Sequence, residues 1–383
     1  MRAALIVQRV LAVLNTDVHL HRMGAVVRGV EAIVRGGRAT LTGIGRSIEG
    51  RTPKHLIKAA DRLLGNLRLQ AELPLFYLAL ARQALPARGR PLLLIDWTDI
   101  GKLWAVLTVT LVGDGRGIII YAQAYPRRRE NDPRLETRCL RELARLLGDA
   151  KPILITDAGF RGPWMKKVRA AGWDFVCRVR NCNKVRFDGQ SAWIETKSLW
   201  RLSKARPALL GQCELGRRHP QVVRLMIVGR WKSPNPKRRI GRRKKKQIQS
   251  ASEPWLLATS LDEATAREVT NLYERRMRIE ETFRDEKCPR FGWALDEAGT
   301  RNVARINVLV MLAAVAHFVA MLIGTAAEKR GIQRRFQANT VRTRRALSLC
   351  RLAHELLLRL PRSELEDLLR AANLAALTVA AYP

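Results

Sequence analysis

The order of apolar segments between residues 88 and 180 constrains the fold more than any other feature of the sequence. Three short runs with strand character, PLLLIDWTD, LWAVLTVTLV and GIIIYAQAY, precede a helical pattern from Pro133 to Leu147. A strand KPILITDAG, a helix beginning near Pro163 and a strand WDFVCRVR complete the series. This β-β-β-α-β-α-β order predicts an α/β fold with a mixed sheet and helices packed on its faces.

The flanking segments are of different kinds. A strand WLLATSL and a long helix from about Ala264 to Lys287 continue the α/β pattern. The apolar run Val308–Ile323 is shorter than the roughly 20 residues that span a bilayer, so it predicts a buried core helix. We expect, in chain order, a helical N-terminal DNA-binding region (1–87), the first part of the core (88–186), an inserted β-rich basic subdomain (187–252), the second part of the core (253–325) and a helical C-terminal region with a role in dimerisation (326–383).

The charge of the chain indicates a polyanionic partner. Its 70 Lys and Arg oppose 34 Asp and Glu, which gives a formal net charge of +36. A hydrophobic content of 47% excludes a disordered basic tail. Because this much like charge destabilises a compact chain, we expect nucleic acid to offset it. An anionic membrane surface is the alternative, disfavoured because the sequence offers no basic amphipathic helix with aromatic anchors.

The cysteines and the N-terminus bear on the compartment. Six cysteines occur without a C-x-x-C pair or a pair of histidines, which disfavours a zinc site or a disulfide framework. A reducing cytosol fits this usage better. Arg2 and Arg9 interrupt the apolar N-terminal segment and argue against a signal peptide. We therefore expect a cytoplasmic protein without a membrane partner.

A basic helix-turn-helix pattern lies in the N-terminal region. The segment ATLTGIGRSIEGRTPKHLIKAADRLLGN resembles two helices joined by a turn, with Thr52 and Pro53 suited to begin the second. Lys54, Lys58 and Arg62 recur four residues apart, away from the apolar stripe. This spacing predicts contacts to a DNA backbone. The alternative is a bundle helix whose basic face is only solvated.

A second basic segment, Lys237–Lys246, reads KRRIGRRKKK. It predicts a flexible loop in the inserted subdomain. A solvated charge run, or a tether that raises the local DNA concentration, is at least as good an explanation as a specific role.

Two aspartates follow apolar strands. Asp96 follows PLLLI and Asp157 follows ILIT. A charge that ends a buried strand is costly unless it meets a cation or faces a cleft, so aspartates on neighbouring strands are expected to converge. For either one alone, a turn-forming Asp is the alternative.

A third carboxylate comes from NLYERRMRIEETFRDEKCPRFGW. At about 100° per residue, one face of a continuous helix carries an aromatic hydroxyl, one carboxylate and several cations, while Glu281 points away into solvent. The residues on this face are Tyr273, Arg276, Glu280, Arg284 and Lys287.

These residues carry a family resemblance. The pattern Y-x-x-R-x-x-x-E-x-x-x-x-x-x-K resembles the signature of the IS-four family of bacterial insertion-sequence transposases. The segments IDWTDI, TDAGF, WLLATSL, RMRIEETFRDEK and FQANTVR are similar to the transposon Tn-ten branch, and the resemblance runs from about Thr40 to Arg345. It implies a ribonuclease-H-like fold with a D-D-E triad, and a cut-and-paste transposase that excises its element through a hairpin intermediate.

The resemblance also implies roles for particular residues. Asp96, Asp157 and Glu280 correspond to the catalytic triad, which holds two Mg²⁺ ions, with Mn²⁺ as a substitute. Hard carboxylate oxygens suit these ions. The corresponding DNA-binding residues are Tyr273, Arg276 and Lys287 on phosphates, Trp255 on a flipped base and Arg178 on a strand near the active site. Met277 departs from relatives that carry an aromatic residue at this position.

The expected partners are double-stranded DNA, as terminal repeats and target, and a second copy of the chain in the synaptic complex. Two alternatives remain. A catalytically silent DNA-binding protein derived from a transposase predicts DNA binding without cleavage. Another ribonuclease-H-fold nuclease shares the triad but has no need of Tyr273, Arg276 and Lys287 together.

Overall fold

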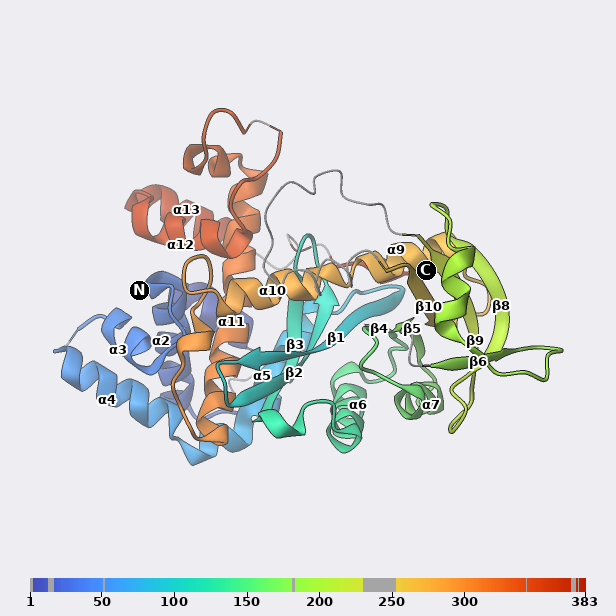
Figure 1. The fold of residues 1–383 in the computed structure, drawn as a ribbon. Coiled ribbons are helices and arrows are strands. Elements are labelled where there is room, and N and C mark those ends of the chain that lie inside the picture. The colour runs from blue at the N-terminus through green and yellow to red at the C-terminus, as the bar shows by residue number, and fades with distance from the viewer. Residues whose placement is uncertain are drawn as a thin grey trace, which may run out of the picture. The chain divides into compact units, whose positions relative to one another are not determined.

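The computed structural model describes residues 3–12, 17–50, 52–180, 183–229, 253–341, 343–372, 377 and 379–383. The basic segment Lys237–Lys246 lies outside these residues. The chain divides into two compact units, each described by itself below. Figure 1 labels the helices and strands named here. Unit 1 comprises Met1–Asp132, Arg141–Ala150 and Arg278–Pro383, and unit 2 comprises Pro133–Leu140 and Lys151–Met277.

The sheet of unit 1 is an antiparallel meander in the order β3-β2-β1. Its strands are β1 (Arg90–Ile100), β2 (Trp104–Val112) and β3 (Gly117–Pro126). Every residue of β2 is buried, as expected for a strand covered on both faces. A short strand, β11 (Ala381–Tyr382), pairs with the start of β1 and ties the C-terminus to this sheet.

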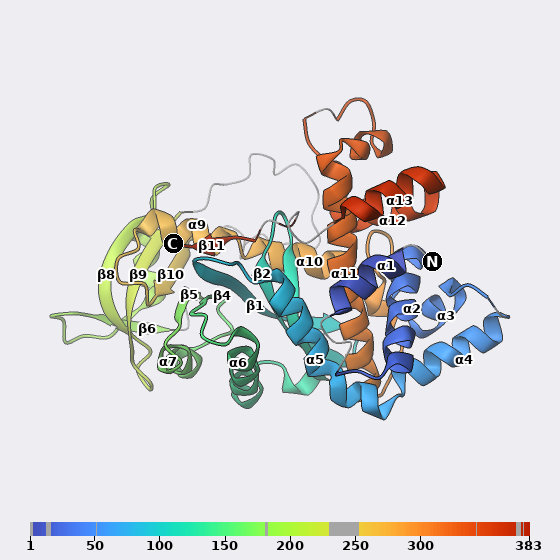
Figure 2. The same ribbon diagram turned by 180° about the vertical axis from the view of Figure 1, so that it is seen from behind.

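A long buried helix, α11 (Val303–Lys329), forms the core of unit 1. It packs on β3 and against α2 (Leu20–Gly36), α5 (Leu67–Ala84) and α12 (Leu349–Arg359), as Figure 2 shows from behind. Among the described residues, this helix alone is long and apolar enough to cross a membrane, and its apolar window is entirely buried within the protein. The prediction of a buried core helix is confirmed.

One side chain of α11, that of Asn307, bonds directly to the backbone of β3. Asn307 accepts a hydrogen bond from the backbone N–H of Ala124 at 2.7 Å and donates one to the carbonyl of Ala124 at 3.3 Å. A buried amide satisfied by strand backbone sets the position of the helix on β3. The remaining helical elements described in unit 1 are α1 (Ala3–Leu11), α3 (Leu41–Ser47), α4 (Pro53–Leu64), η2 (Arg127–Arg129), α10 (Met277–Lys287), η4 (Leu295–Glu297), η5 (Ile332–Phe336) and α13 (Arg362–Ala371).

The predicted helix pair in the N-terminal region is present as α3 and α4. Helix α4 begins at Pro53, directly after Thr52, as its sequence predicts. Gly45 of α3 lies against α4, because a Cβ there would sit 2.6 Å from the Cα of Ile57. The glycine therefore permits a close approach of the two helices.

Unit 2 is built on a mixed sheet in the order β4-β5-β10-β9-β8-β6-β7. Strand β4 (Ile153–Thr156) is parallel to β5 (Asp174–Val179), and β5 is antiparallel to β10 (Trp255–Thr259). The described part of the inserted region, 187–229, contains β7, β8 and β9, and it extends the sheet because β9 pairs with β10. The other elements are β6 (Lys184–Phe187), β7 (Ile194–Glu195), η3 (Thr196–Leu202), β8 (Ala208–Leu215), β9 (Gln221–Val228), α7 (Gly162–Ala170) and α9 (Ala266–Glu274).

Helix α6 (Pro133–Leu147) has the predicted bounds and contributes residues to both units. The order of strands and helices from β1 to β5 is the predicted one. The chain is therefore of the α/β class, with mixed sheet structure and helical flanks.

The long helix predicted from Ala264 to Lys287 is wrong as a single element. Helix α9 ends at Glu274 and α10 begins at Met277. Between them, the N–H of Arg276 bonds to the carbonyl of Tyr273 at 2.9 Å, which is an i→i+3 contact in place of the helical i→i+4 contact. Because helical periodicity continues on both sides of the tightened turn, the sequence pattern does not show the break.

Candidate active site

Asp96 lies within a strand and not at its end. Strand β1 continues to Ile100, and Asp96 pairs in register with Thr108 of β2. The prediction that Asp96 ends its strand is wrong, because polar residues after Asp96 still join the ladder. The side chain is half-buried, and it accepts a hydrogen bond from the backbone N–H of Trp97 at 2.9 Å.

Asp96 and Glu280 line the same hollow in unit 1, which has a volume of ≈ 400 Å³. The other lining residues are Trp97, Phe283, Arg284 and Lys287. Glu280 stands exposed in the first turn of α10, where the helix dipole favours a negative charge. Two predicted carboxylates and two predicted cations are thus brought together within one unit.

Lys287 is held against β1. Its Nζ donates to Thr98 Oγ1 at 2.8 Å and to the carbonyl of Asp99 at 3.2 Å. The ammonium also lies 5.8 Å from the centre of the Phe283 ring. These contacts fix the cation at the rim of the hollow and attach the end of α10 to the strand that carries Asp96.

The remaining side chains of α10 divide between the hollow and its surroundings. Arg284 is exposed and lies 3.6 Å from the carboxylate of Glu281. Glu281 also lies 3.6 Å from Arg116, so it is a half-buried ion-pair partner and not the solvated residue expected from the sequence. Its position away from the hollow agrees with the predicted face.

In unit 2, Asp157 directly follows β4, as predicted. Its Oδ1 accepts a hydrogen bond from the N–H of Gly159 at 2.7 Å. This is the turn-forming contact that the sequence offered as the alternative. The side chain is half-buried.

Three further predicted residues of unit 2, Trp255, Arg276 and Arg178, lie near Tyr273. The Tyr273 ring is 3% exposed and meets Trp255 edge-on, with ring centres 4.9 Å apart. Burial raises the pKa of Tyr273, while the charges of Arg276 and Arg178 lower it and that of Asp157 raises it. A hydrogen bond between Arg276 and the Tyr273 hydroxyl acts in the same direction as the two arginine charges.

Arg178 extends from β5 and forms an ion pair with Glu253 at 3.3 Å. Its side chain is 10% exposed, so the pair is largely shielded from water. Part of its charge is therefore already balanced within the protein.

Trp255 lines a groove of ≈ 1240 Å³ in unit 2. Three cations that the sequence did not single out, Lys204, Arg206 and Arg267, line the same groove. Lys204 and Arg206 come from the segment before β8, and Arg267 comes from α9. Nothing in their spacing along the sequence connects them with Trp255.

The cations predicted to contact DNA on α4 are exposed. Lys54, Lys58 and Arg62 all lie on the surface of unit 1. Their exposure agrees with both readings of this helix, as a DNA-contacting element and as a bundle helix with a solvated face.

The donor chemistry of the hollow fits a hard divalent cation. Mg²⁺ is usually bound through one or two carboxylates and keeps several of its waters. Asp96 and Glu280 supply carboxylate oxygens in a hollow that is open to solvent. Nothing in its lining offers a soft ligand, because the other residues are aromatic or cationic.

Comparison with known proteins identifies the family. The sequence profile described as "Transposase DDE domain" matches residues 87–318, more than half of the chain. No curated protein matches the sequence. A solved structure of a piggyBac transposase synaptic complex with hairpin DNA is similar at 12% identity and a TM-score of 0.42, covering 96% of this chain and 78% of that one. On the profile match, the chain belongs to the family of transposases with a DDE domain.

Proposed function

We propose that the protein is a cut-and-paste DNA transposase of the IS-four family, transposon Tn-ten branch. It binds the terminal inverted repeats of its element, excises the element through a hairpin intermediate and transfers the 3′ ends into target DNA. One observation of the structure carries the proposal within this family. Asp96 and Glu280, two of the three carboxylates expected from the sequence, line one hollow together with Arg284 and Lys287.

Asp96, Asp157 and Glu280 are the proposed ligands of two Mg²⁺ ions, for which Mn²⁺ can substitute. When bound, the ions supply Lewis-acid stabilisation of the charge on the attacking and leaving oxygens of a phosphodiester. No side chain of the protein has to act as a nucleophile in this chemistry. The carboxylates orient the site, and the cations beside them hold the DNA.

Arg284 and Lys287 are the proposed phosphate contacts beside the carboxylates. Lys287 is restrained by Thr98 and the backbone of Asp99, so its charge is presented at a fixed place. Arg284 is exposed, and it lies 3.6 Å from the carboxylate of Glu281 and 6.0 Å from the centre of the Phe291 ring. A restrained cation positions a phosphate with little loss of side-chain entropy on binding, whereas a mobile one contributes mainly attraction.

Tyr273, Arg276, Trp255 and Arg178 are the proposed contacts of unit 2 with the transposon end. Trp255 is half-buried against Tyr273 and lines a groove bordered by cations. An aromatic ring with basic neighbours suits an unpaired base and its phosphates. The groove supports the proposed stacking of a flipped base on Trp255.

Two further assignments extend the proposal. The α4 cations Lys54, Lys58 and Arg62 contact the backbone of the terminal repeat. The division of the chain at residues 87, 186, 252 and 325 separates DNA binding, the two parts of the catalytic core, the insertion and dimerisation. The protein acts in the bacterial cytoplasm on nucleoid DNA.

The active species is a homodimer on DNA, with the C-terminal helices at its interface. One face of α12 is buried within unit 1 against α11. Deleting α12 would therefore expose α11, and a lost dimer would no longer report on the interface alone. Leu358 is 55% exposed on α12 and offers a cleaner probe. Leu358→Glu is expected to abolish the dimer on terminal-repeat DNA in analytical ultracentrifugation, and a dimer that persists would refute this interface.

The decisive experiment uses a labelled duplex that bears the element's own terminal repeat, with Mg²⁺ and with EDTA. Wild type is compared with Glu280→Gln, which keeps the shape and removes the charge, and with Glu281→Gln as the matched neighbour. We expect nicking followed by a hairpin in wild type and in Glu281→Gln, and DNA binding alone in Glu280→Gln. Nicking without a hairpin would point to a simpler nuclease, and binding without cleavage in all three proteins to a silent binder.

A further inference from the structure

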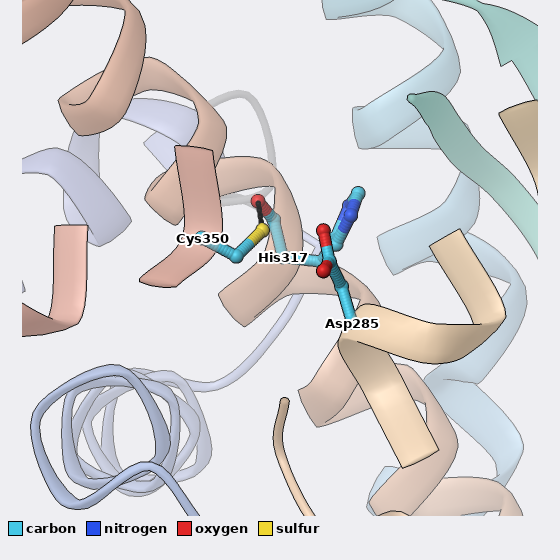
Figure 3. A group of neighbouring side chains, drawn as sticks. All are labelled: Asp285, His317 and Cys350. Carbon is cyan, nitrogen blue, oxygen red and sulfur yellow. Dashed lines mark hydrogen bonds between the residues drawn. The ribbon is translucent and has the colours of Figure 1, made fainter. Parts of the chain in front are cut away.

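Three side chains of different chemistry meet in the interior of unit 1. Asp285 comes from α10, His317 from α11 and Cys350 from α12, and all three are buried (Figure 3). One ligand atom of each lies within 4.8 Å of those of the other two. The three helices are distant in sequence, so the cluster is a product of tertiary packing.

His317 is unusual for its position. It lies in the middle of the most apolar helix of unit 1 and is fully buried. Neither ring nitrogen has a hydrogen-bond partner among the residues that the structure describes. Buried polar groups are nearly always satisfied, so an imidazole with two unused nitrogens requires an explanation. Burial lowers the pKa of His317 to about 4, so the ring is neutral and a nitrogen lone pair is available.

The thiol of Cys350 lies where it can lose its proton and bind a metal cation through sulfur. Its sulfur lies 4.0 Å from the carbonyl oxygen of His317, which Figure 3 marks, and the thiol also bonds to the carboxylate of Asp285. Burial and the neighbouring carboxylate raise the pKa of this thiol. A metal ion that binds the sulfur displaces that proton to solvent, so thiolate and metal form together.

Arg116 supports the carboxylate from outside the cluster. Its Nε donates to Asp285 Oδ2 at 2.7 Å, and its other end reaches Glu281 at 3.6 Å. Ligating carboxylates are commonly held by an outer hydrogen bond of this kind. The charges also balance. The Asp285 carboxylate and the Cys350 thiolate neutralise a divalent cation, and Glu281 remains as a partner of the Arg116 guanidinium.

We propose that Asp285, His317 and Cys350 bind a structural zinc ion. Sulfur, imidazole nitrogen and carboxylate oxygen are the donor types that zinc takes, whereas Mg²⁺ takes oxygen alone. The second oxygen of Asp285 or one enclosed water completes a tetrahedral set. The site shares no residue with the Asp96 and Glu280 hollow, and it is independent of the proposed transposition chemistry.

The ion joins three helices. It attaches α10, whose first turn carries Glu280, to the core helix α11 and to the C-terminal helix α12. Asp285 follows Glu280 by five residues, about 7.5 Å along the helix axis. Zinc at this place holds the helix that presents Glu280, without touching DNA.

The test is the zinc content of the full-length protein, purified and then refolded with zinc in slight excess. Wild type is compared with His317→Gln and Cys350→Ser, and with Cys213→Ser as a control, since Cys213 is a buried thiol of unit 2. We expect about one zinc ion per chain in wild type and control, and below about 0.1 in the two cluster variants. The proposal is overturned if wild type retains no zinc, or if His317→Gln retains as much zinc as wild type. Either result would leave a buried water, and not zinc, as the partner of the His317 ring.

A second measurement needs no variant to fold. Cobalt is introduced into wild type in place of zinc, and the electronic spectrum is recorded. A thiolate-to-cobalt charge-transfer band with the visible bands of a tetrahedral ion, both bleached by added zinc, is the expected result. Bound cobalt without a thiolate band would exclude Cys350 as a ligand and overturn the assignment. The cobalt spectrum does not depend on DNA cleavage, so a failure of magnesium-dependent cleavage would leave this result unchanged.

Discussion

Two of the carboxylates of helix α10, Glu280 and Asp285, have opposite surroundings. Glu280 is exposed and lines a solvent-filled hollow with Asp96. Asp285 is 3% exposed and lies among Arg116, His317 and Cys350. Five residues rotate a helix by about 140° beyond one full turn, so the two side chains leave on nearly opposite faces.

On the two proposals, surroundings and not residue type decide which ion a carboxylate of α10 holds. In the hollow, oxygen donors and solvent suit an ion that keeps its waters. In the core, sulfur, nitrogen and a single carboxylate suit an ion that sheds them. The hollow should therefore control activity with little effect on stability, and the cluster should control stability.

The largest expected effect separates these roles. Asp96→Asn should lower single-turnover cleavage by more than about 10³-fold, because a ligand charge is lost in the transition state. Its free energy of unfolding should change by less than about 1 kcal/mol, since the side chain is half-buried and the amide oxygen can still accept from Trp97. Asp99→Asn, which loses an exposed ion pair with Arg127 at 2.7 Å, is the control. Cleavage near the wild-type rate in Asp96→Asn would remove this residue from the triad.

The reciprocal change acts on stability. Asp285→Asn should lower the free energy of unfolding by about 3–5 kcal/mol, because it leaves Arg116 largely buried without its closest anion. Urea denaturation measures the loss. Glu281→Gln, which lies 3.6 Å from the same arginine and is 40% exposed, should cost less than about 1 kcal/mol. Equal effects in the two variants would mean that burial does not distinguish these carboxylates.

A glycine next to the cluster tests the packing of its helices. At Gly324 of α11, a Cβ would lie 2.5 Å from the carbonyl oxygen of Leu349, the residue before Cys350. Gly324→Ala should therefore destabilise unit 1 by about 1–3 kcal/mol and lower its zinc content. Gly24→Ala is the matched control in a helix, since its nearest contact is a flexible arginine end at 3.6 Å. A Gly324→Ala protein as stable as the control would show that α11 and α12 can move apart to fit the added methyl group without loss of stability.

The smallest expected effect concerns pH. His354 of α12 is buried, and burial lowers its pKa although a contact from Nδ1 to the carbonyl of Val34 raises it. The unfolded chain then binds a proton more readily than the folded one, so stability falls as pH drops below about 6.5. His354→Gln should reduce this acid loss, measured as urea midpoints at about pH 7.5 and about pH 5.5. An unchanged acid slope would show that His354 does not contribute to it.

Periodicity and turn chemistry were enough to predict much of the chain. The order from β1 to β5, the bounds of α6 and the start of α4 follow from local patterns of apolar, polar and capping residues. The burial of α11 follows from its composition and length. The residues of the proposed signature can be picked out from the sequence because they lie close together along the chain.

Other features depend on contacts that local patterns do not encode. The break at Arg275 and Arg276 changes hydrogen bonding but not apolar spacing, so one helix was expected where there are two. Asp96 was expected at the end of a strand, but β2 continues to pair with β1 beyond it. Lys204, Arg206 and Arg267 join Trp255 only through the groove of unit 2.

The sequence by itself determined the α/β class, the charge that suits DNA and the family, because each is carried by composition or by motifs of nearby residues. Tertiary structure alone decided that Asp285, His317 and Cys350 meet, since they come from three helices and share no spacing rule. It also decided which carboxylate of α10 meets solvent and which meets the core. The physical reason is that a helix fixes only the angle between its side chains, while the packing around it sets the medium that each one enters.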